Sequence, residues 1–328
     1  MLLDNHGREI NYLRLAVTDR CNLRCFYCMP ESGINYMKRK DLLSFEEMYR
    51  MINVFSKMGI AKLRITGGEP FVRKGIIEFL EEVSKNSNIE EINITTNGTT
   101  TKQFIPTLEK LGIKNINLSL DTLNKERFHK ITRRDYFDEV YETYLALLDS
   151  SLDVKINMVV MNGKNIDDIY GMIELTKNHN VSVRFIEEMP FNGTIGQGNN
   201  SFWPHKKILN HIEKRYQFSA LPNLPSSTSV NYKIEGYKGS FGVIAAFTRS
   251  FCGSCNRVRV TPQGQLKTCL YDGGVFSIRD LMRSGASNVE LAEAFIKALN
   301  LRFKDGFEAE EKRLLAQPVS ESMATIGG

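Results

Sequence analysis

The sequence predicts an α/β fold, with a parallel sheet in the first part of the chain and a smaller α+β part after it. Strand-like and helix-like segments alternate between residues 12 and 189, which is typical of βαβ units. After residue 190 the chain changes to loops, short strands and a few helices. Six βα units could form either a doubly wound sheet or a partial barrel.

The expected strands of the first part alternate between apolar and polar residues. Leu13 and Leu15 lie on one face of the first expected strand, and Arg14 lies on the other. Buried parallel strands normally read as continuous apolar runs. We therefore expect one face of the sheet to pack against helices and the other to line a polar interior. The six segments are 12–18, 62–66, 91–96, 115–121, 154–161 and 182–188.

Cations recur on the polar faces of these strands. Burying several like charges close together costs free energy unless a ligand of opposite charge pairs with them. The pattern therefore predicts an anionic ligand, and the alternative is an open sheet whose polar face meets solvent. The cations are Arg14, Lys62, Arg64, Lys155 and Arg184.

Two helices are expected in the first part and two in the second. Ser44 and Glu47 form a capping box before the helix expected at 45–58. Apolar spacing predicts further helices near 138–149, 203–216 and 288–301.

The second part is expected to contain antiparallel strands and a linker. The turn 262–264 joins two of those strands, and the segment 221–229 is rich in proline and serine. We place a domain boundary so that residues 1–190 form the core and residues 191–328 the C-terminal extension. The expected strands are 232–234, 240–245, 257–261 and 265–269.

Composition limits the classes of protein. The 328 residues include 43 Lys and Arg against 38 Asp and Glu, a net charge of +5, which suits an anionic ligand but does not argue for nucleic acid. No apolar run approaches the ~20 residues of a membrane span, and no signal peptide is visible. We expect a cytoplasmic protein with reduced thiols, and no membrane partner.

All six cysteines fall in two short clusters, C-x3-C-x2-C and C-x2-C-x13-C. Each cluster offers three thiolates, whereas a tetrahedral metal or a cubane takes four ligands. The spacing predicts two metal centres, each with one open position. A disulfide framework and structural zinc sites remain alternatives. The clusters are Cys21, Cys25 and Cys28, and then Cys252, Cys255 and Cys269.

The first cysteine cluster resembles the signature of the radical S-adenosylmethionine (radical SAM) superfamily. Tyr27 precedes the third cysteine, and Gly67-Gly68-Glu69-Pro70 resembles the superfamily's GGEP segment. The resemblance implies a partial (β/α)6 barrel of the TIM type. It also implies a [4Fe-4S] cluster that binds S-adenosylmethionine and reduces it to a 5′-deoxyadenosyl radical.

Further motifs resemble one branch of that superfamily, the GTP 3′,8-cyclases of molybdenum cofactor biosynthesis. The similarity covers about residues 8–328 and is weakest between 190 and 230. The motifs are Thr18-Asp19-Arg20, the segment 131–135, the segment 251–259 with Cys269, and Gly327-Gly328.

This resemblance implies roles for individual residues. A second [4Fe-4S] cluster on Cys252, Cys255 and Cys269 would bind guanine. Contacts to S-adenosylmethionine would come from Tyr27, Gly68, Ser119 and Met189. Contacts to GTP would come from Arg14, Lys62, Arg64, Thr95, Lys155, Arg184, Arg257, Val258 and Arg259. Arg257, Arg259, Gly327 and Gly328 would act in catalysis.

The implied reaction joins ribose C3′ to guanine C8 and gives (8S)-3′,8-cyclo-7,8-dihydroguanosine 5′-triphosphate. The implied partners are GTP, an external one-electron donor and the downstream cyclic pyranopterin monophosphate synthase, and a homodimer is compatible with the resemblance. One alternative is another radical SAM enzyme with an auxiliary cluster, acting on a peptide or RNA. A non-catalytic zinc-stabilised binding protein is the other.

Overall fold

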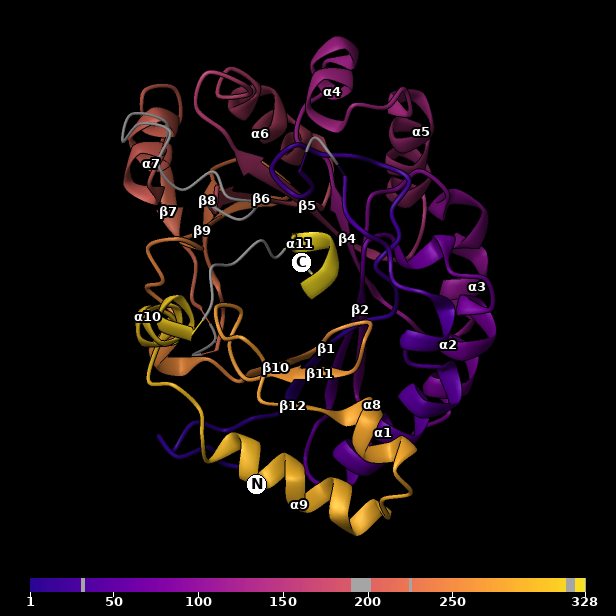
Figure 1. Cartoon of the computed structure of the whole chain (residues 1–328). Coiled ribbons are helices and arrows are strands. Elements are labelled where there is room, and N and C mark those ends of the chain that lie inside the picture. The colour runs from indigo at the N-terminus through magenta and orange to yellow at the C-terminus, as the bar shows by residue number, and fades with distance from the viewer. Residues whose placement is uncertain (31–32, 190–201, 224–225, 317–321, 328) are drawn as a thin grey trace.

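The computed structural model describes residues 1–30, 33–189, 202–223, 226–316 and 322–327. One sheet of 12 strands runs through these residues in the order β12-β11-β10-β1-β2-β3-β4-β5-β6-β9-β8-β7. The sheet curls around a central space, and most helices cover its outside (Figure 1). In these described ranges, no helix is both long and apolar enough to cross a membrane.

The strands and helices have the following bounds. The strands are β1 Tyr12–Ala16, β2 Lys62–Thr66, β3 Glu91–Thr96, β4 Asn115–Ser119, β5 Asp153–Val160, β6 Ser182–Glu187, β7 Phe218–Ala220, β8 Ser229–Ile234, β9 Ser240–Ile244, β10 Arg257–Val260, β11 Gln265–Lys267 and β12 Phe276–Ser277. The helices are α1 Phe45–Lys57, α2 Ile76–Ser84, α3 Ile105–Lys110, α4 Lys125–Thr132, α5 Phe137–Leu148, α6 Asp168–Asn178, α7 His205–Glu213, α8 Ile278–Arg283, α9 Asn288–Leu299, α10 Gly306–Ala316 and α11 Met323–Ile326.

The six strands expected in the first part are confirmed, and they pair in parallel from β1 to β6. The antiparallel prediction for the second part is correct for β8–β9 and β10–β11. It is wrong where these strands join the first part of the chain, because β9 pairs in parallel with β6 and β10 in parallel with β1. A hairpin pattern is local, whereas these pairings depend on distant packing. Strands from both parts therefore share one sheet, and the division at residue 190 stays a prediction.

The alternation of side chains along the strands sorts the sheet into two faces. Leu13, Leu63 and Ile94 are fully buried in the hydrophobic core, against the helices. The intervening residues face inward, and the register places Arg14 beside both Arg64 and Arg259. The prediction of a polar interior is confirmed, because a sheet covered by helices on one side must turn its other face to the central space.

The helices cover the outer face as their sequences dictate. The capping box of α1 is present, since Ser44 Oγ accepts from Glu47 N–H at 3.2 Å and Glu47 accepts from Ser44 N–H at 2.7 Å. Phe55 of α1 stacks on Phe295 of α9, with ring centroids 3.9 Å apart. This contact ties the C-terminal extension to the outside of the barrel.

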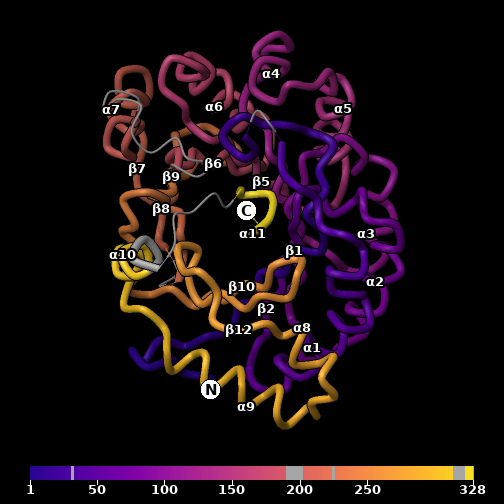
Figure 2. The backbone as a smooth tube through the Cα atoms, in the orientation of Figure 1, coloured from indigo at the N-terminus to yellow at the C-terminus, as the bar shows by residue number. Residues whose placement is uncertain are grey.

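The short helix α11 lies elsewhere, inside the space that the strands enclose (Figures 1 and 2). Ser322 caps it by accepting from Ala324 N–H at 3.3 Å. The end of the described chain is therefore placed next to the inward-facing residues of the strands.

Candidate active site

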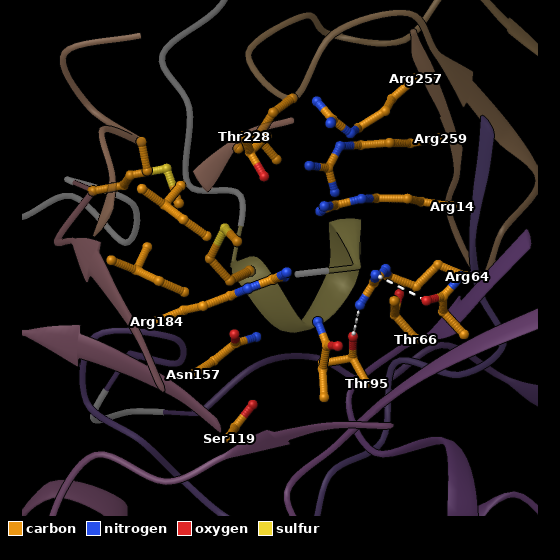
Figure 3. A pocket seen from close by; sticks show the side chains of 18 of the residues that line it. Arg14, Arg64, Thr66, Thr95, Ser119, Asn157, Arg184, Thr228, Arg257 and Arg259 are labelled. Atoms are coloured by element: carbon orange, nitrogen blue, oxygen red, sulfur yellow. Dashed lines mark hydrogen bonds between the residues drawn. The ribbon is translucent and has the colours of Figure 1, made fainter. Parts of the chain in front are cut away.

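The inward faces of the strands enclose a cavity of about 510 Å³. Both cysteine clusters line it, together with side chains of β1 to β6, β10 and α11. Figure 3 shows Arg14, Arg257 and Arg259 projecting from one wall. Arg184, Asn157 and Ser119 project from the strands across the space. The sequence-predicted site residues on its lining are Cys21, Cys25, Tyr27, Cys28, Arg14, Lys62, Arg64, Gly68, Thr95, Ser119, Lys155, Arg184, Met189, Cys252, Cys255, Arg257, Arg259 and Cys269.

The first cysteine cluster follows β1 and lies at one end of the cavity. Cys21 Sγ accepts from Leu23 N–H at 3.4 Å and from Asn97 Nδ2 at 3.5 Å. Burial raises the pKa of Cys21 to about 11 and that of Cys28 to about 12, because it disfavours the thiolate. A bound cationic cluster would offset that cost, so three such thiols facing one cavity suit iron–sulfur ligation.

The two glycines after β2 are required by the approach of the cysteine loop. A Cβ at Gly67 would lie 2.6 Å from Thr18 O, and one at Gly68 would lie 2.2 Å from Arg20 O. Gly68 N–H donates to Thr18 O at 2.7 Å, so this segment pairs with the chain just before Cys21. Both glycines are therefore required by close contact with the protein's own backbone, and Gly68 also lines the cavity.

Glu69, the residue after these two glycines, holds the segment in place through hydrogen bonds to its carboxylate. Its buried carboxylate accepts from Phe71 N–H at 3.1 Å, from Asn97 N–H at 2.6 Å and from Thr96 Oγ1 at 2.8 Å. Burial raises its pKa to about 7, although these hydrogen bonds lower it. Glu69 thus joins the end of β2 to the end of β3.

Tyr27 is held in place by an acid that the sequence did not single out. Its hydroxyl donates to Asp121 Oδ2 at 2.8 Å, and Asp121 Oδ1 accepts from Val159 N–H at 2.8 Å. Burial raises the pKa of Asp121 to about 6. Asp121 therefore orients an aromatic ring beside the first cysteine cluster, where Ser119 also faces the cavity.

Three arginines form a row across β10, β1 and β2: Arg259, Arg14 and Arg64. Arg64 donates from Nε to the Tyr12 hydroxyl at 2.5 Å and from Nη1 to Thr95 Oγ1 at 3.1 Å. The guanidinium carbons of Arg14 and Arg64 lie 5.9 and 5.8 Å from the centre of the Tyr12 ring. Tyr12 escaped prediction, although its place two residues before Arg14 put it on the same strand face.

Lys155 and Arg184 face that row from the other side. Lys155 Nζ donates to Asn115 Oδ1 at 2.9 Å. Burial, reinforced by nearby Arg64, lowers the pKa of Arg184 to about 10, and burial also lowers the pKa of Lys155. Both shifts show that the cavity disfavours further positive charge, so a polyanion would be stabilised there.

Among the described residues, several buried donors on the lining of this cavity have no hydrogen-bond partner in the protein. They include the Nε atoms of Arg14, Arg184 and Arg257, and also Nε and Nη1 of Arg249. An unsatisfied buried donor is costly, and an oxyanion such as a phosphate accepts several such hydrogen bonds at once. The cavity is therefore suited to a ligand with several phosphate oxygens.

Lys62 differs from the other predicted cations because it already has a partner. Its Nζ lies 2.5 Å from Glu91 Oε2, and both side chains are partly exposed. Glu91 was not predicted from the sequence, although it precedes Asn93 on the inward face of β3. The negative charge of Glu91 offsets the positive charge of Lys62, so we expect Lys62 to attract an anionic ligand less strongly than Arg14 or Arg184 does.

The second cysteine cluster lines the opposite end of the cavity. Burial raises the pKa of Cys269 to about 11. The pKa of Cys255 is lowered instead, because Arg302 and Arg257 outweigh the effect of burial. Within the ranges that the structure covers, no three His, Cys, Asp or Glu side chains are grouped to hold a single metal ion. A cubane offers each thiolate its own iron, so its ligands do not have to converge on one point.

The side chains of Arg257 and Arg259 lie on one face of β10, and that of Val258 lies on the other. Arg257 and Arg259 line the cavity, as predicted for residues two apart on a strand. The side chain of Val258 is fully buried in the hydrophobic core, so only its backbone is available to a ligand. Arg259 Nη1 donates to Gly327 O at 2.7 Å. Gly328 lies outside the described residues.

One stretch of the cavity wall came from a segment in which no motif was recognised. Ser226, Ser227 and Thr228 line the cavity, and Arg257 donates a hydrogen bond to Ser226 O. The only signal in the sequence was a run of hydroxyl side chains, which is equally typical of a linker. The glycine-rich part of the loop after Met189, residues 190–201, lies outside the described residues.

Two family models together match most of the chain. The model of the radical SAM superfamily matches residues 15–176, and that of Molybdenum Cofactor Synthesis C matches residues 181–307. A GTP 3′,8-cyclase of Syntrophomonas wolfei is 38% identical over 323 residues, which cover 96% of this chain and 99% of that protein.

Animal relatives are longer than this chain. The molybdenum cofactor biosynthesis protein moc-5 of Caenorhabditis elegans is 40% identical over 90% of this chain, but the chain spans only 50% of it. Among solved structures, Streptococcus suis SuiB bound to S-adenosylmethionine has a TM-score of 0.55 at 14% identity. That match covers 84% of this chain and 66% of SuiB, and it shows a shared fold.

Proposed function

The chain belongs to the radical SAM superfamily and, within it, to the family of GTP 3′,8-cyclases, and we propose that it converts GTP into (8S)-3′,8-cyclo-7,8-dihydroguanosine 5′-triphosphate. This reaction is the first step of molybdenum cofactor biosynthesis. One observation carries the proposal: two cysteine triplets face a single cavity, and arginines with unpartnered donors lie on its wall.

A member of this superfamily uses S-adenosylmethionine and a [4Fe-4S] cluster, and Cys21, Cys25 and Cys28 are the ligands that we assign to that cluster. When bound, the cluster and S-adenosylmethionine would supply the radical chemistry that the proposed cyclisation requires, which is loss of the C3′ hydrogen of GTP, formation of a C3′–C8 bond, and addition of one electron and one proton to the base. Gly68 and Tyr27 lie beside this triplet on the cavity wall and would orient the methionine and adenine parts. Ser119 and Met189 complete the predicted contacts.

The triphosphate fits the cationic part of the cavity. A fully ionised triphosphate carries about four negative charges, which would reverse the pKa shifts of Arg14, Arg184 and Lys155. Their donors would bind its oxygens in place of the missing protein partners. Arg64 and Thr95 are already hydrogen-bonded to each other and offer a preformed edge for the same group. Lys62 would contribute less because of its ion pair with Glu91.

We propose that Cys252, Cys255 and Cys269 hold a second [4Fe-4S] cluster, whose open iron would bind guanine. Arg257 and Arg259 line the cavity on β10, which begins two residues after Cys255 and pairs with the strand of Arg14. From there they can orient the nucleotide and exclude water. Gly327 receives a hydrogen bond from Arg259 and would hold that side chain in position. Gly328 is proposed to act with it, and Val258 through its backbone.

The reaction also needs partners. An external donor must supply electrons one at a time, and the cyclised nucleotide must pass to cyclic pyranopterin monophosphate synthase. We propose that the protein works in a reducing compartment such as the cytoplasm, because the six cysteines proposed as ligands are all free thiols. A homodimer is compatible with the family.

The proposal is tested by incubating the reconstituted protein anaerobically with S-adenosylmethionine, a reductant and one candidate substrate at a time. GTP should yield 5′-deoxyadenosine and a cyclised nucleotide, whereas ATP and a cysteine-containing peptide should yield neither above background. Equal 5′-deoxyadenosine with all three substrates, and no cyclised nucleotide, would contradict the proposal.

A further inference from the structure

Arg302 lies directly behind the second cysteine triplet, just after α9. Its side chain is 3% exposed and directs its donors at this region. Nη2 donates to Cys255 Sγ at 3.1 Å, and Nη1 donates to Cys255 O at 3.0 Å. Nε donates to Thr268 O at 3.1 Å, next to Cys269. One guanidinium therefore contacts the segments that supply two of the three thiols.

A buried acid holds this arginine. Asp4 Oδ2 accepts from Arg302 Nη1 at 3.1 Å and from Arg8 Nε at 2.7 Å. Arg8 in turn donates to Cys252 O at 3.1 Å. These hydrogen bonds join the start of the chain, through Asp4 and Arg8, to Arg302 and to the backbone of Cys252.

The two triplets differ in the charge of their hydrogen-bond donors. At the first triplet, Cys21 Sγ accepts from the neutral N–H of Leu23 and the neutral amide of Asn97, and the one cation beside it, Arg24, donates to the carbonyl oxygen of Cys21 rather than to its sulfur. At the second triplet, Cys255 Sγ accepts a hydrogen bond from the positively charged guanidinium group of Arg302. Reduction of an iron–sulfur cluster adds negative charge to the irons and their sulfurs. Hydrogen bonds and positive charge at the sulfurs stabilise the reduced form and so raise the reduction potential.

We propose that Arg302 is a positioning residue that raises the reduction potential of the cluster on Cys252, Cys255 and Cys269 above that of the cluster on the first triplet. Asp4 sets the strength of this effect, because its carboxylate neutralises part of the positive charge. An electron that enters the protein is then stabilised at the end of the cavity where guanine is proposed to bind. This inference depends on the second cluster of the proposed function.

The test is a redox titration of both clusters in the reconstituted full-length protein, with EPR spectroscopy as the readout of each cluster's oxidation state. Added S-adenosylmethionine changes the spectrum of the first cluster and so identifies it. The variants are Arg302→Met, Arg302→Lys and Asp4→Asn. Arg283→Met serves as a matched control, because Arg283 pairs with Glu47 and, in the part of the chain that the structure describes, hydrogen-bonds to no cysteine.

We expect the second cluster of the unmodified protein to have the higher potential. In Arg302→Met its reduced form should be disfavoured at least tenfold, a fall of about 59 mV for one electron. Arg302→Lys keeps the charge and should restore most of the potential, whereas Arg283→Met should change neither cluster. Each variant should retain about eight irons per chain. A purely structural role for Arg302 would instead lower the iron content and leave the potential of the remaining clusters unchanged.

Two results separate the possible failures. Arg302→Met with about eight irons and an unchanged second potential would overturn the role of Arg302 while leaving the proposed function intact. Only about four irons in the unmodified protein would overturn the second cluster itself. If Arg302→Met does not retain its cluster, Asp4→Asn decides the question. That change removes a negative charge and should raise the second potential, so an unchanged or lower value would overturn the proposal.

Discussion

Arg259 donates a 2.7 Å hydrogen bond to the carbonyl oxygen of Gly327, 68 residues further along the chain. At the other end of the same short segment, Ser322 Oγ donates to Cys28 O at 2.5 Å. Residues 322–327 therefore connect the loop of the first cysteine triplet to an arginine that faces the second. Any change that displaces α11 should disturb both ends of the cavity together.

Gly327→Ala should displace this segment. Gly327 has a φ of +76°, and an added Cβ would lie 2.7 Å from Ala16 Cβ and 2.8 Å from Thr66 Oγ1. We expect product formation to fall about 100-fold, because a small misplacement of a positioning group has effects of that order. GTP affinity should stay within about threefold, and the two quantities are measured by anaerobic product assay and equilibrium dialysis.

Gly285→Ala is the matched control for that variant. Gly285 also has a positive φ, of +92°, but no atom lies within 4 Å of its added Cβ. In both variants, placing alanine in a left-handed backbone conformation costs about 1–2 kcal/mol. Only Gly327→Ala adds a steric clash. An equal loss of product in both variants would remove any special role for Gly327.

Arg184→Met should weaken GTP binding selectively. Arg184 is a buried cation with an unpartnered Nε in the cavity, and hydrogen bonds to charged groups contribute about 1.5–3 kcal/mol. The dissociation constant for GTP should therefore rise roughly 10- to 100-fold, while that for guanosine stays unchanged. Calorimetry with both ligands measures this difference. Arg127→Met, which breaks an ion pair with Asp168 on the outer helices, should bind GTP normally, and equal losses for guanosine and GTP would argue against triphosphate recognition.

Cys269→Ala should separate the two proposed clusters. The variant should retain about four of about eight irons, because the first triplet is intact. It should still cleave S-adenosylmethionine but form no cyclised nucleotide. Iron analysis and chromatography of the products check both statements. Ser254→Ala changes an exposed residue between Cys252 and Cys255 and should behave as the unmodified protein. Normal turnover by Cys269→Ala would show that the second triplet is not needed.

Glu69 should make stability fall as pH rises toward neutrality. Burial raises its pKa to about 7, above the ordinary value of 4.5, so the folded state binds the proton more tightly than the unfolded state does. Its favourable contribution is complete below about pH 4.5 and is lost as pH rises through about 7, a change on the order of 3 kcal/mol.

Glu69→Gln cannot ionise and should flatten this pH dependence. The variant should be less stable than the parent at pH 5, because its NH₂ group, unlike the hydroxyl oxygen of a protonated Glu69, cannot accept a hydrogen bond from the backbone N–H groups of Phe71 and Asn97. Its free energy of unfolding should nevertheless change less between pH 5 and pH 8, as measured by urea denaturation. Glu78→Gln, at an exposed position of α2, is the control. A slope in Glu69→Gln as steep as in the parent would assign the pH dependence to other groups.

Local periodicity predicted the inward-facing residues of the barrel well. A strand of period two places Arg14 and Arg64 on one face whatever the rest of the chain does, and the structure confirms it. The cysteine loop and the glycines after β2 were also readable, because their chemistry is compressed into short segments.

Contacts between distant segments were beyond local reasoning. The parallel pairing of β9 with β6 depends on packing that no hairpin signal encodes. Arg302 reaches Cys255 from 47 residues away, and Asp4 reaches Arg302 from 298 residues away. The serines at 226–227 line the cavity only because the segment folds back toward Arg257.

The central claim, that this cavity cyclises GTP by removing its C3′ hydrogen, is tested most directly with GTP that carries deuterium at C3′. The reconstituted protein is incubated anaerobically with this GTP, S-adenosylmethionine and a reductant, and the products are analysed by mass spectrometry. We predict one deuterium in 5′-deoxyadenosine and an equimolar amount of cyclised nucleotide. Unlabelled 5′-deoxyadenosine, formed at the same rate with or without GTP and with no cyclised nucleotide, would contradict the claim.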